Sequence, residues 1–216
     1  MSQNNVITVL TTDIRNFTYH SRKYERESEH EFEKRFKLLC DIVKNFHNKT
    51  LEAAKRHDEK KQAITLTTGD GLVIGFQDKK HVITAYHTIL DLQREYNDFF
   101  RAANEDMGEK RKSTALGYGI GAHTGRVIIE RYNSYHTPHG LETIILGDAL
   151  NISTRLESLT KDHTHCNILI SEDTYHMLIE QLGNGVCNQF IDYQVHNIRG
   201  YRPLRLYGIR EELETH

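Results

Sequence analysis

Two aspartates stand where the surrounding sequence makes a carboxylate unusual. Asp13 follows the apolar segment 6–10, and Asp70 lies in the glycine-rich turn 68–71 between two further apolar segments. Two carboxylates that meet in space repel each other unless a cation lies between them, so this pair is a candidate ligand set for a divalent metal ion. The spacing supports a structural interpretation about equally well: Asp13 caps a following helix and Asp70 is an ordinary turn residue.

A second group of residues could bind an anion. Asn151 and Arg155 are four residues apart and therefore share one face of an expected helix. An amide beside a guanidinium suits an anionic oxygen. Taken alone, this segment is more simply explained as a solvated polar face beside Glu157. Arg199, which precedes a glycine, is either a phosphate contact or an exposed arginine near a strand end.

Apolar periodicity predicts the elements that must position these residues. The order is β-α-β-β-α-β followed by further helices and strands, a split βαβ pattern. It predicts an α+β fold, ferredoxin-like, with helices on one face of the sheet. Without an internal repeat or linker, residues 1–216 are expected to form a single domain. Strands are expected at 6–10, 63–67, 72–76, 116–123, 127–132, 143–146, 167–170, 190–198 and 204–209, and helices at 32–46, 82–99, 147–159 and 171–182.

Composition narrows the class of protein. The 216 residues carry 28 basic and 30 acidic side chains, a formal net charge of −2, which argues against a protein held mainly by nucleic-acid phosphates. No segment approaches the ~18 apolar residues of a membrane helix, and the polar start predicts no signal peptide. Three distant cysteines do not form a disulfide framework, so a cytoplasmic location is expected. The fourteen histidines are scattered and are expected to be surface residues rather than metal ligands.

Several short segments, weak alone but consistent in their order, decide between these interpretations. Through five such segments, which occur in the family's order, the chain resembles the class III nucleotidyl cyclase catalytic domain along nearly its whole length. The fourth segment, from Leu146 to Glu157, is the most specific. The segments are Asp13-Ile14-Arg15-Asn16-Phe17-Thr18, Thr68-Gly69-Asp70, Gly121-Ala122-His123-Thr124-Gly125, the run Leu146-Gly147-Asp148-Ala149-Leu150-Asn151 through Arg155-Leu156-Glu157, and Arg199-Gly200 before Pro203-Leu204-Arg205-Leu206-Tyr207.

The resemblance implies a metal and triphosphate site in the first half of the chain. Asp13 and Asp70 would hold two divalent ions, Mn²⁺ or Mg²⁺, with the carbonyl of Ile14 as an additional ligand. Backbone N–H groups near Phe17 and Thr18 would cradle the triphosphate at a helix start. These residues would bind a nucleoside triphosphate substrate.

The resemblance implies that the second half of the chain completes the active site of a second protomer. Asn151 would orient the ribose, Arg155 would stabilise charge on the α-phosphoryl group, and Arg199 would meet the outgoing phosphates. In the family the metal aspartates come from one protomer and the asparagine and arginine from the other. A homodimer with two equivalent sites is therefore implied. The loop 132–140 either reaches across this dimer or is disordered.

The base-reading positions depart from those of purine cyclases. The family commonly places polar side chains four residues before the second metal aspartate and seven before the asparagine, which here are Leu66 and Ile144. A further departure is Gly119, where many members carry an arginine. Leu66 and Ile144 are expected to narrow the base pocket for a single-ring base, a departure that is similar to the bacterial pyrimidine cyclases.

The resemblance to those enzymes implies UTP or CTP as substrate and cyclic UMP or cyclic CMP as product. It also implies a role in antiphage defence through a separate effector protein that the messenger activates. An unorthodox adenylate or guanylate cyclase with loose selectivity is the alternative, because apolar contacts discriminate by only ~1–3 kcal/mol. A catalytically inactive nucleotide-binding module is less favoured, because both aspartates, Asn151 and Arg155 are present.

Overall fold

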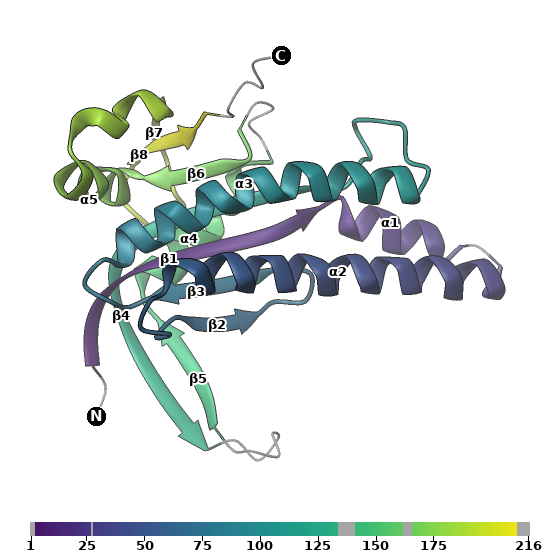
Figure 1. Cartoon of the computed structure of the whole chain (residues 1–216), viewed down its shortest axis with the longest axis horizontal. Coiled ribbons are helices and arrows are strands. Elements are labelled where there is room, and N and C mark those ends of the chain that lie inside the picture. Colours follow the sequence, from purple (N-terminus) through teal and green to yellow (C-terminus); the bar gives the residue numbers. More distant parts are fainter. Residues whose placement is uncertain (1–2, 27, 134–140, 162–165, 211–216) are drawn as a thin grey trace.

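The structure is a computed structural model, and it describes residues 3–26, 28–133, 141–161 and 166–210 (Figure 1). The strands are β1 (Gln3–Arg15), β2 (Ile64–Thr67), β3 (Leu72–Phe76), β4 (Gly117–Asn133), β5 (Leu141–Leu146), β6 (Ile168–Ser171), β7 (Phe190–His196) and β8 (Leu204–Ile209). The helices are α1 (Phe17–Tyr24), α2 (Glu29–His57), α3 (His81–Asp106), α4 (Asp148–Leu159), α5 (Glu172–Leu182) and the 3-10 helix η1 (Asn184–Gln189).

One mixed sheet organises the described chain. Its strand order is β2-β3-β1-β4-β6-β8-β7, and β5 pairs with β4 beside this path. β1 runs antiparallel to both β3 and β4, while β4 and β6 are parallel. The first four strands of this order have the arrangement of a split βαβ unit, because α2 carries the chain from β1 to β2 and the β2–β3 hairpin then places β3 between these two strands. The predicted α+β fold class is confirmed.

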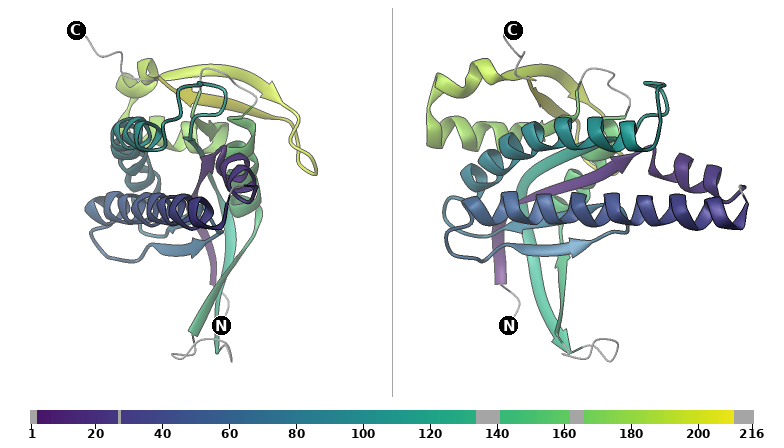
Figure 2. Two further views of the ribbon diagram at one scale, coloured as in Figure 1. Left: turned by 90° about the vertical axis from the view of Figure 1, so that its right-hand side faces the viewer. Right: turned by 45° about the vertical axis from the view of Figure 1, so that its right-hand side comes forward.

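Helices cover both faces of this sheet, whereas the sequence predicted one. Thr8 and Thr11, which are three residues apart on β1, point to opposite faces. Thr8 Oγ1 lies 2.8 Å from His81 Nδ1 of α3, and Thr11 Oγ1 lies 2.9 Å from Ser153 Oγ of α4. Figure 2 shows α2 and α3 on one side of the sheet and α4 on the other. α5 packs with α3, so α4 alone among the long helices departs from the prediction.

β4 is one continuous strand, although its glycines predicted a break near residues 124–126. The glycines mark where α4 approaches the strand closely. A Cβ on Gly121 would lie 2.1 Å from the carbonyl oxygen of Ser153 and 2.3 Å from the backbone nitrogen of Glu157. Glycine inside a strand serves close approach of another backbone as readily as it serves a turn. α4, the helix that carries Asn151 and Arg155, therefore packs very closely against β4.

Both long helices extend beyond their predicted ends. α2 continues past Phe46 because small side chains, Thr50, Ala53 and Ala54, replace the large apolar ones on its buried face. α3 continues to Asp106, where a loop was expected. Asn104 stabilises this end, since its Nδ2 donates to the carbonyl oxygen of Leu116 (2.9 Å) and its Oδ1 accepts from the Leu116 N–H (2.7 Å).

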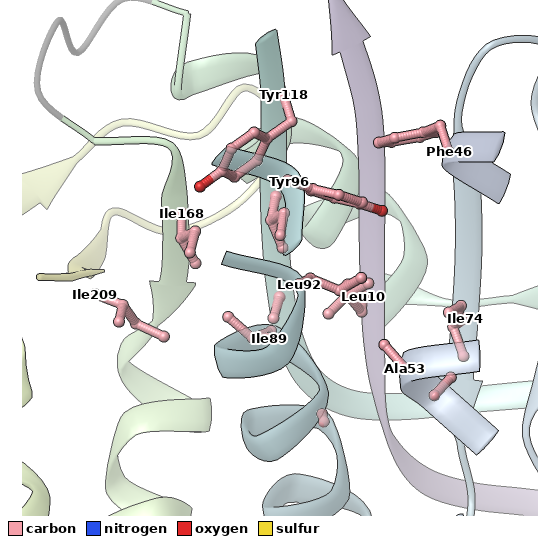
Figure 3. Close-up of a cluster of buried hydrophobic side chains, with 14 of the residues drawn as sticks. Leu10, Phe46, Ala53, Ile74, Ile89, Leu92, Tyr96, Tyr118, Ile168 and Ile209 are labelled. Carbon is pink, nitrogen blue, oxygen red and sulfur yellow. The ribbon is translucent and has the colours of Figure 1, made fainter. Parts of the chain in front are cut away.

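The largest core fills the space between α2, α3 and the sheet (Figure 3). Phe46 and Tyr96 stack there with ring centroids 4.7 Å apart, and Tyr96 is completely buried. The Tyr96 hydroxyl is paired with that of Thr50, so the ring leaves no polar group without a partner. Each long helix is thereby fixed to the sheet that carries Asp13.

Three properties concern the remaining expectations. None of the helices in the described residues is long and apolar enough to cross a membrane. Among the described residues, Cys40, Cys166 and Cys187 form no disulfide. Most of the predicted loop 132–140 lies outside the described residues, which resume at Leu141 in β5.

Replacing Gly121 by alanine is expected to destabilise the protein by about 1–3 kcal/mol, because the added methyl group meets backbone atoms of α4 that cannot rotate away. The free energy of unfolding in urea measures this effect. Gly185→Ala is the matched control, since a Cβ at Gly185 has no heavy atom within 4 Å and should change the free energy by less than about 0.5 kcal/mol. Equal stabilities of the two variants would contradict the close approach of α4.

Candidate active site

Asp13 and Asp70 lie together at one edge of the sheet. Asp13 is near the end of β1, and the β2–β3 turn that carries Asp70 is brought beside it by the pairing of Thr12 with Leu72. The contact is tight, because a Cβ on Gly71 would lie 2.7 Å from the carbonyl oxygen of Thr12 and 3.0 Å from Asp13 Oδ1. The two predicted metal ligands, 57 positions apart in the sequence, therefore face the same small space.

The electrostatics of this pair fit a cation. Burial raises the pKa of Asp70, and the neighbouring charge of Asp13 raises it further, while Lys161 opposes both effects. Both causes penalise the ionised carboxylate, so negative charge is under-compensated at the turn. No group of three or more His, Cys, Asp or Glu side chains within the described residues is arranged to hold a metal ion. Further ligands would have to be the Ile14 carbonyl, water or substrate oxygens.

Lys161 is a charged neighbour of this pair that the sequence did not single out. Its Nζ lies 3.3 Å from Asp13 Oδ2 and 3.8 Å from Glu157 Oε1. Glu157 is buried, and burial raises its pKa, with Asp13 adding to the rise and Lys161 and Arg15 opposing it. Lys161 follows the end of α4, 148 positions from Asp13. Only the packing of α4 on β1 and β4 brings the two together.

The start of α1 provides backbone donors next to Asp13. Asn16, the residue before α1, has a left-handed backbone with φ 63°, and its side chain does not cap the helix. Instead, Asn16 Nδ2 donates to the carbonyl oxygen of Ala115 at 2.7 Å. The first N–H groups of a helix lack partners within that helix. Phe17 and Thr18, predicted to cradle a triphosphate, therefore begin a helix whose first residues have no side-chain cap.

α4 turns Asn151 and Arg155 away from the sheet. The helix buries Ala149, Ile152 and Leu156 against the strands, which leaves Asn151 exposed and Arg155 partly exposed on the opposite side. The close approach of Gly147 to Arg126 fixes the start of this helix, because a Cβ there would lie 2.5 Å from the Arg126 carbonyl oxygen.

The outward face of α4 meets the connection between β7 and β8. The Arg155 guanidinium lies over the ring of Tyr201, 5.1 Å from its centroid, and a Cβ on Gly200 would lie 3.8 Å from Arg155 Nη1. This Nη1 is buried and no acceptor in the described chain reaches it. Arg199 is exposed in the same turn. The structure thus brings the turn at 199–201 to Arg155; Tyr201, which the sequence did not single out, forms part of this contact.

The two predicted base-pocket residues lie on different faces of the sheet. Leu66 packs against a buried cluster that includes Ile145 of β5. Ile144 is the preceding residue of the same strand, so its side chain points to the opposite face, and it is exposed opposite Glu130 of β4. The structure does not bring Leu66 and Ile144 together within one chain.

Comparison with known proteins identifies the family. Residues 1–209 match the family described as the adenylate and guanylate cyclase catalytic domain, and the chain belongs to this family. An adenylate cyclase of Anabaena cylindrica is 27% identical over 169 residues, which cover 77% of this chain and 29% of that much longer protein.

Solved structures of this family share the fold. The adenylyl cyclase CyaB from P. aeruginosa superimposes with a TM-score of 0.71 at 20% identity, covering 99% of this chain and 98% of the other. The guanylyl cyclase Cya2 gives a TM-score of 0.70 at 19% identity, covering 99% and 96%. At these identities the likeness establishes the fold alone.

Proposed function

We propose that the protein is a nucleotidyl cyclase that converts a nucleoside triphosphate into a 3′,5′-cyclic nucleotide and pyrophosphate. The observation that carries this proposal is the juxtaposition of Asp13 and Asp70, whose negative charge is under-compensated, in a chain of the cyclase family. Two divalent ions held by these carboxylates and the Ile14 carbonyl would lower the pKa of the ribose 3′-hydroxyl and neutralise the charge of the leaving phosphates.

The chain's own residues position the substrate and stabilise charge. The uncapped N–H groups at Phe17 and Thr18 bind phosphate oxygens at the start of α1. Asn151 holds the ribose so that its 3′-oxygen lies in line with the α-phosphorus. Arg155, whose Nη1 has no acceptor within the described chain, donates to the α-phosphoryl oxygens as their charge grows. Arg199 meets the departing phosphates.

The proposed enzyme is a homodimer whose sites are shared. Asn151 and Arg155 face away from the sheet of their own chain, which suits delivery to the aspartates of a second copy. A second feature is the β4–β5 hairpin, which projects from the molecule (Figure 1). Its cross-strand pair Ile128 and Leu146 is 40% and 56% exposed. An exposed apolar pair on a projecting hairpin is typical of a surface that another chain covers.

For the substrate we propose a pyrimidine nucleotide, UTP or CTP. Neither Leu66 nor Ile144 offers a hydrogen-bonding group to a purine edge. Because Leu66 and Ile144 lie on different faces of one chain's sheet, either of them would offer a base an apolar contact, and backbone groups would read the edge of a smaller base. The proposal extends to a signalling role in antiphage defence, with a separate effector protein that reads the cyclic nucleotide. An adenylate or guanylate cyclase is the second candidate, and the family description and the adenylate cyclase of Anabaena cylindrica favour it.

One assay tests both candidates. The protein is incubated with Mn²⁺ and equal concentrations of ATP, GTP, CTP and UTP, and the products are identified by mass spectrometry. We expect one cyclic pyrimidine nucleotide to dominate. Cyclic AMP or cyclic GMP alone would overturn the pyrimidine assignment and retain the cyclase. Binding of a nucleotide without any cyclic product would instead favour a nucleotide-binding module.

A further inference from the structure

We propose that Lys161 is a tethered counter-cation of the metal site. Its ammonium neutralises Asp13 when no metal ion is present, and it moves to the triphosphate of the nucleotide when the site is loaded. The inference rests on the proposed function, because it takes Asp13 as a metal ligand. It adds a residue that exchanges partners during substrate binding.

The ammonium group of Lys161 lies beside two carboxylates. Lys161 Nζ contacts Asp13 Oδ2 at 3.3 Å and lies 3.8 Å from Glu157 Oε1. It therefore sits beside the carboxylate that the metal would use. The carboxylates require a positive charge at this point. The ammonium group supplies one unit of positive charge, where a divalent ion would supply two.

A second cation beside this group, Arg15, directs its hydrogen bonds elsewhere. Arg15 also faces Glu157, but its Nη1 donates to Asn167 Oδ1 and its Nη2 to the carbonyl oxygen of Thr160, both at 2.8 Å. Arg15 thus ties β1 to the segments that flank residues 162–165. Glu157 Oε1 accepts no hydrogen bond from the described chain. Arg15 also lowers the pKa of Glu157, but among the described cations only Lys161 forms an ion pair with both Asp13 and Glu157.

Lys161 is the most exposed of the three ionic side chains that meet here. The Lys161 side chain is 47% exposed, whereas Asp13 is 27% and Glu157 only 5% exposed. The strand beneath supplies no competing side chain, because Gly119 has no Cβ and one added there would lie 2.5 Å from Glu157 Oε1. A flexible ammonium beside an entering divalent ion is repelled by it, and the phosphate oxygens that the metal brings offer the lysine a new anionic partner.

The exchange predicts opposite effects on two binding steps. Without Lys161, Asp13 has no competing cation, so a divalent ion alone binds more tightly. The nucleotide loses one cationic contact, so its KM rises. A merely structural lysine would weaken both steps together when it is removed. The opposite signs therefore distinguish the exchange from simple support of the fold.

The test measures Mn²⁺ binding to the nucleotide-free protein from the electron paramagnetic resonance signal of the free ion. Lys161→Met is expected to lower the dissociation constant of Mn²⁺ about fivefold, the size of a partly exposed ion pair. It should raise the KM of the preferred nucleotide by a similar factor at saturating Mn²⁺. Lys161→Arg should resemble the wild type. Lys44→Met is the matched control, because Lys44 forms an exposed pair with Asp41 at 3.5 Å on α2.

The outcomes separate the inference from the proposed function. Asp13→Asn is included to establish that Mn²⁺ binds at this carboxylate. If Asp13→Asn weakens Mn²⁺ binding and Lys161→Met leaves it unchanged or weakens it, the inference is overturned and the metal site stands. If Asp13→Asn leaves Mn²⁺ binding unchanged, both are overturned. Tighter Mn²⁺ binding in Lys161→Met, with a raised KM and a normal Lys44→Met control, supports the exchange.

Discussion

Replacement of Asp13 by alanine is expected to reduce cyclic-nucleotide formation by more than about 10³-fold, because metal-assisted stabilisation of charge is worth several kcal/mol. The side chain is one of the two carboxylates that meet beside the β2–β3 turn, and no group of three or more His, Cys, Asp or Glu side chains in the described chain could hold a metal ion instead. The effect is measured by assaying the purified variant at saturating Mn²⁺ and quantifying the cyclic nucleotide by mass spectrometry.

The variant should lose activity and keep its fold. Asp13 repels Asp70 and Glu157, so its removal lifts part of the penalty that raises the pKa of both groups, while the surface pair with Lys161 contributes little. Thermal unfolding and the oligomeric state in size-exclusion chromatography should therefore match the wild type. Asp41→Ala, which removes an exposed carboxylate on α2, controls for the loss of a charge. An active Asp13→Ala enzyme would show that the metal assignment is wrong.

Much of the fold could be predicted because large apolar side chains mark its elements. β3 and β8 begin and end at the predicted residues, and so does α4 within a residue, since each combines an apolar pattern with glycine, proline or polar residues at its ends. Two of the errors, the early end of α2 and the break in β4, lie where small residues carry the packing. Gly121 permits contact with α4, whereas the sequence predicted a break a few residues further along β4.

The meeting of Asp13 and Asp70 could be predicted from the sequence, whereas the charged neighbour Lys161 could not. Asp13 and Asp70 meet because the crossover helix and the hairpin that follows it place β3 beside β1, and the split βαβ pattern predicts that neighbourhood. Lys161 had no such signal, since it stands after a helix end in a polar segment. Its contact with Asp13 depends on the face of the sheet that α4 covers, and the sequence placed the helices on one face only. Had helices been predicted on both faces of the sheet, the packing of α4 on β1 could have been foreseen.

The proposed sharing of the site between two chains leads to a prediction for Arg155. Arg155→Ala is expected to lower kcat by about 10²–10³-fold, the effect of removing one donor to a transition-state oxyanion. The protein should remain folded, because Arg155 faces outward and its described neighbours are the Tyr201 ring and the turn at Gly200. Arg202→Ala is a suitable control, since Arg202 is an exposed arginine of the same connection that pairs with Glu172. Steady-state kinetics with the preferred nucleotide measures the loss.

Mixing the two inactive variants tests whether the site belongs to two chains. If Asp13 and Arg155 act in different protomers, a heterodimer of Asp13→Ala and Arg155→Ala carries both lesions in one site and none in the other. Random exchange in an equal mixture makes half of the dimers mixed, so about a quarter of the wild-type activity should return. If both residues served the same chain's site, each protomer would carry one lesion and no activity would return. Recovery that depends on the time allowed for subunit exchange would establish the symmetric pairing that delivers Arg155 to the aspartates of its partner.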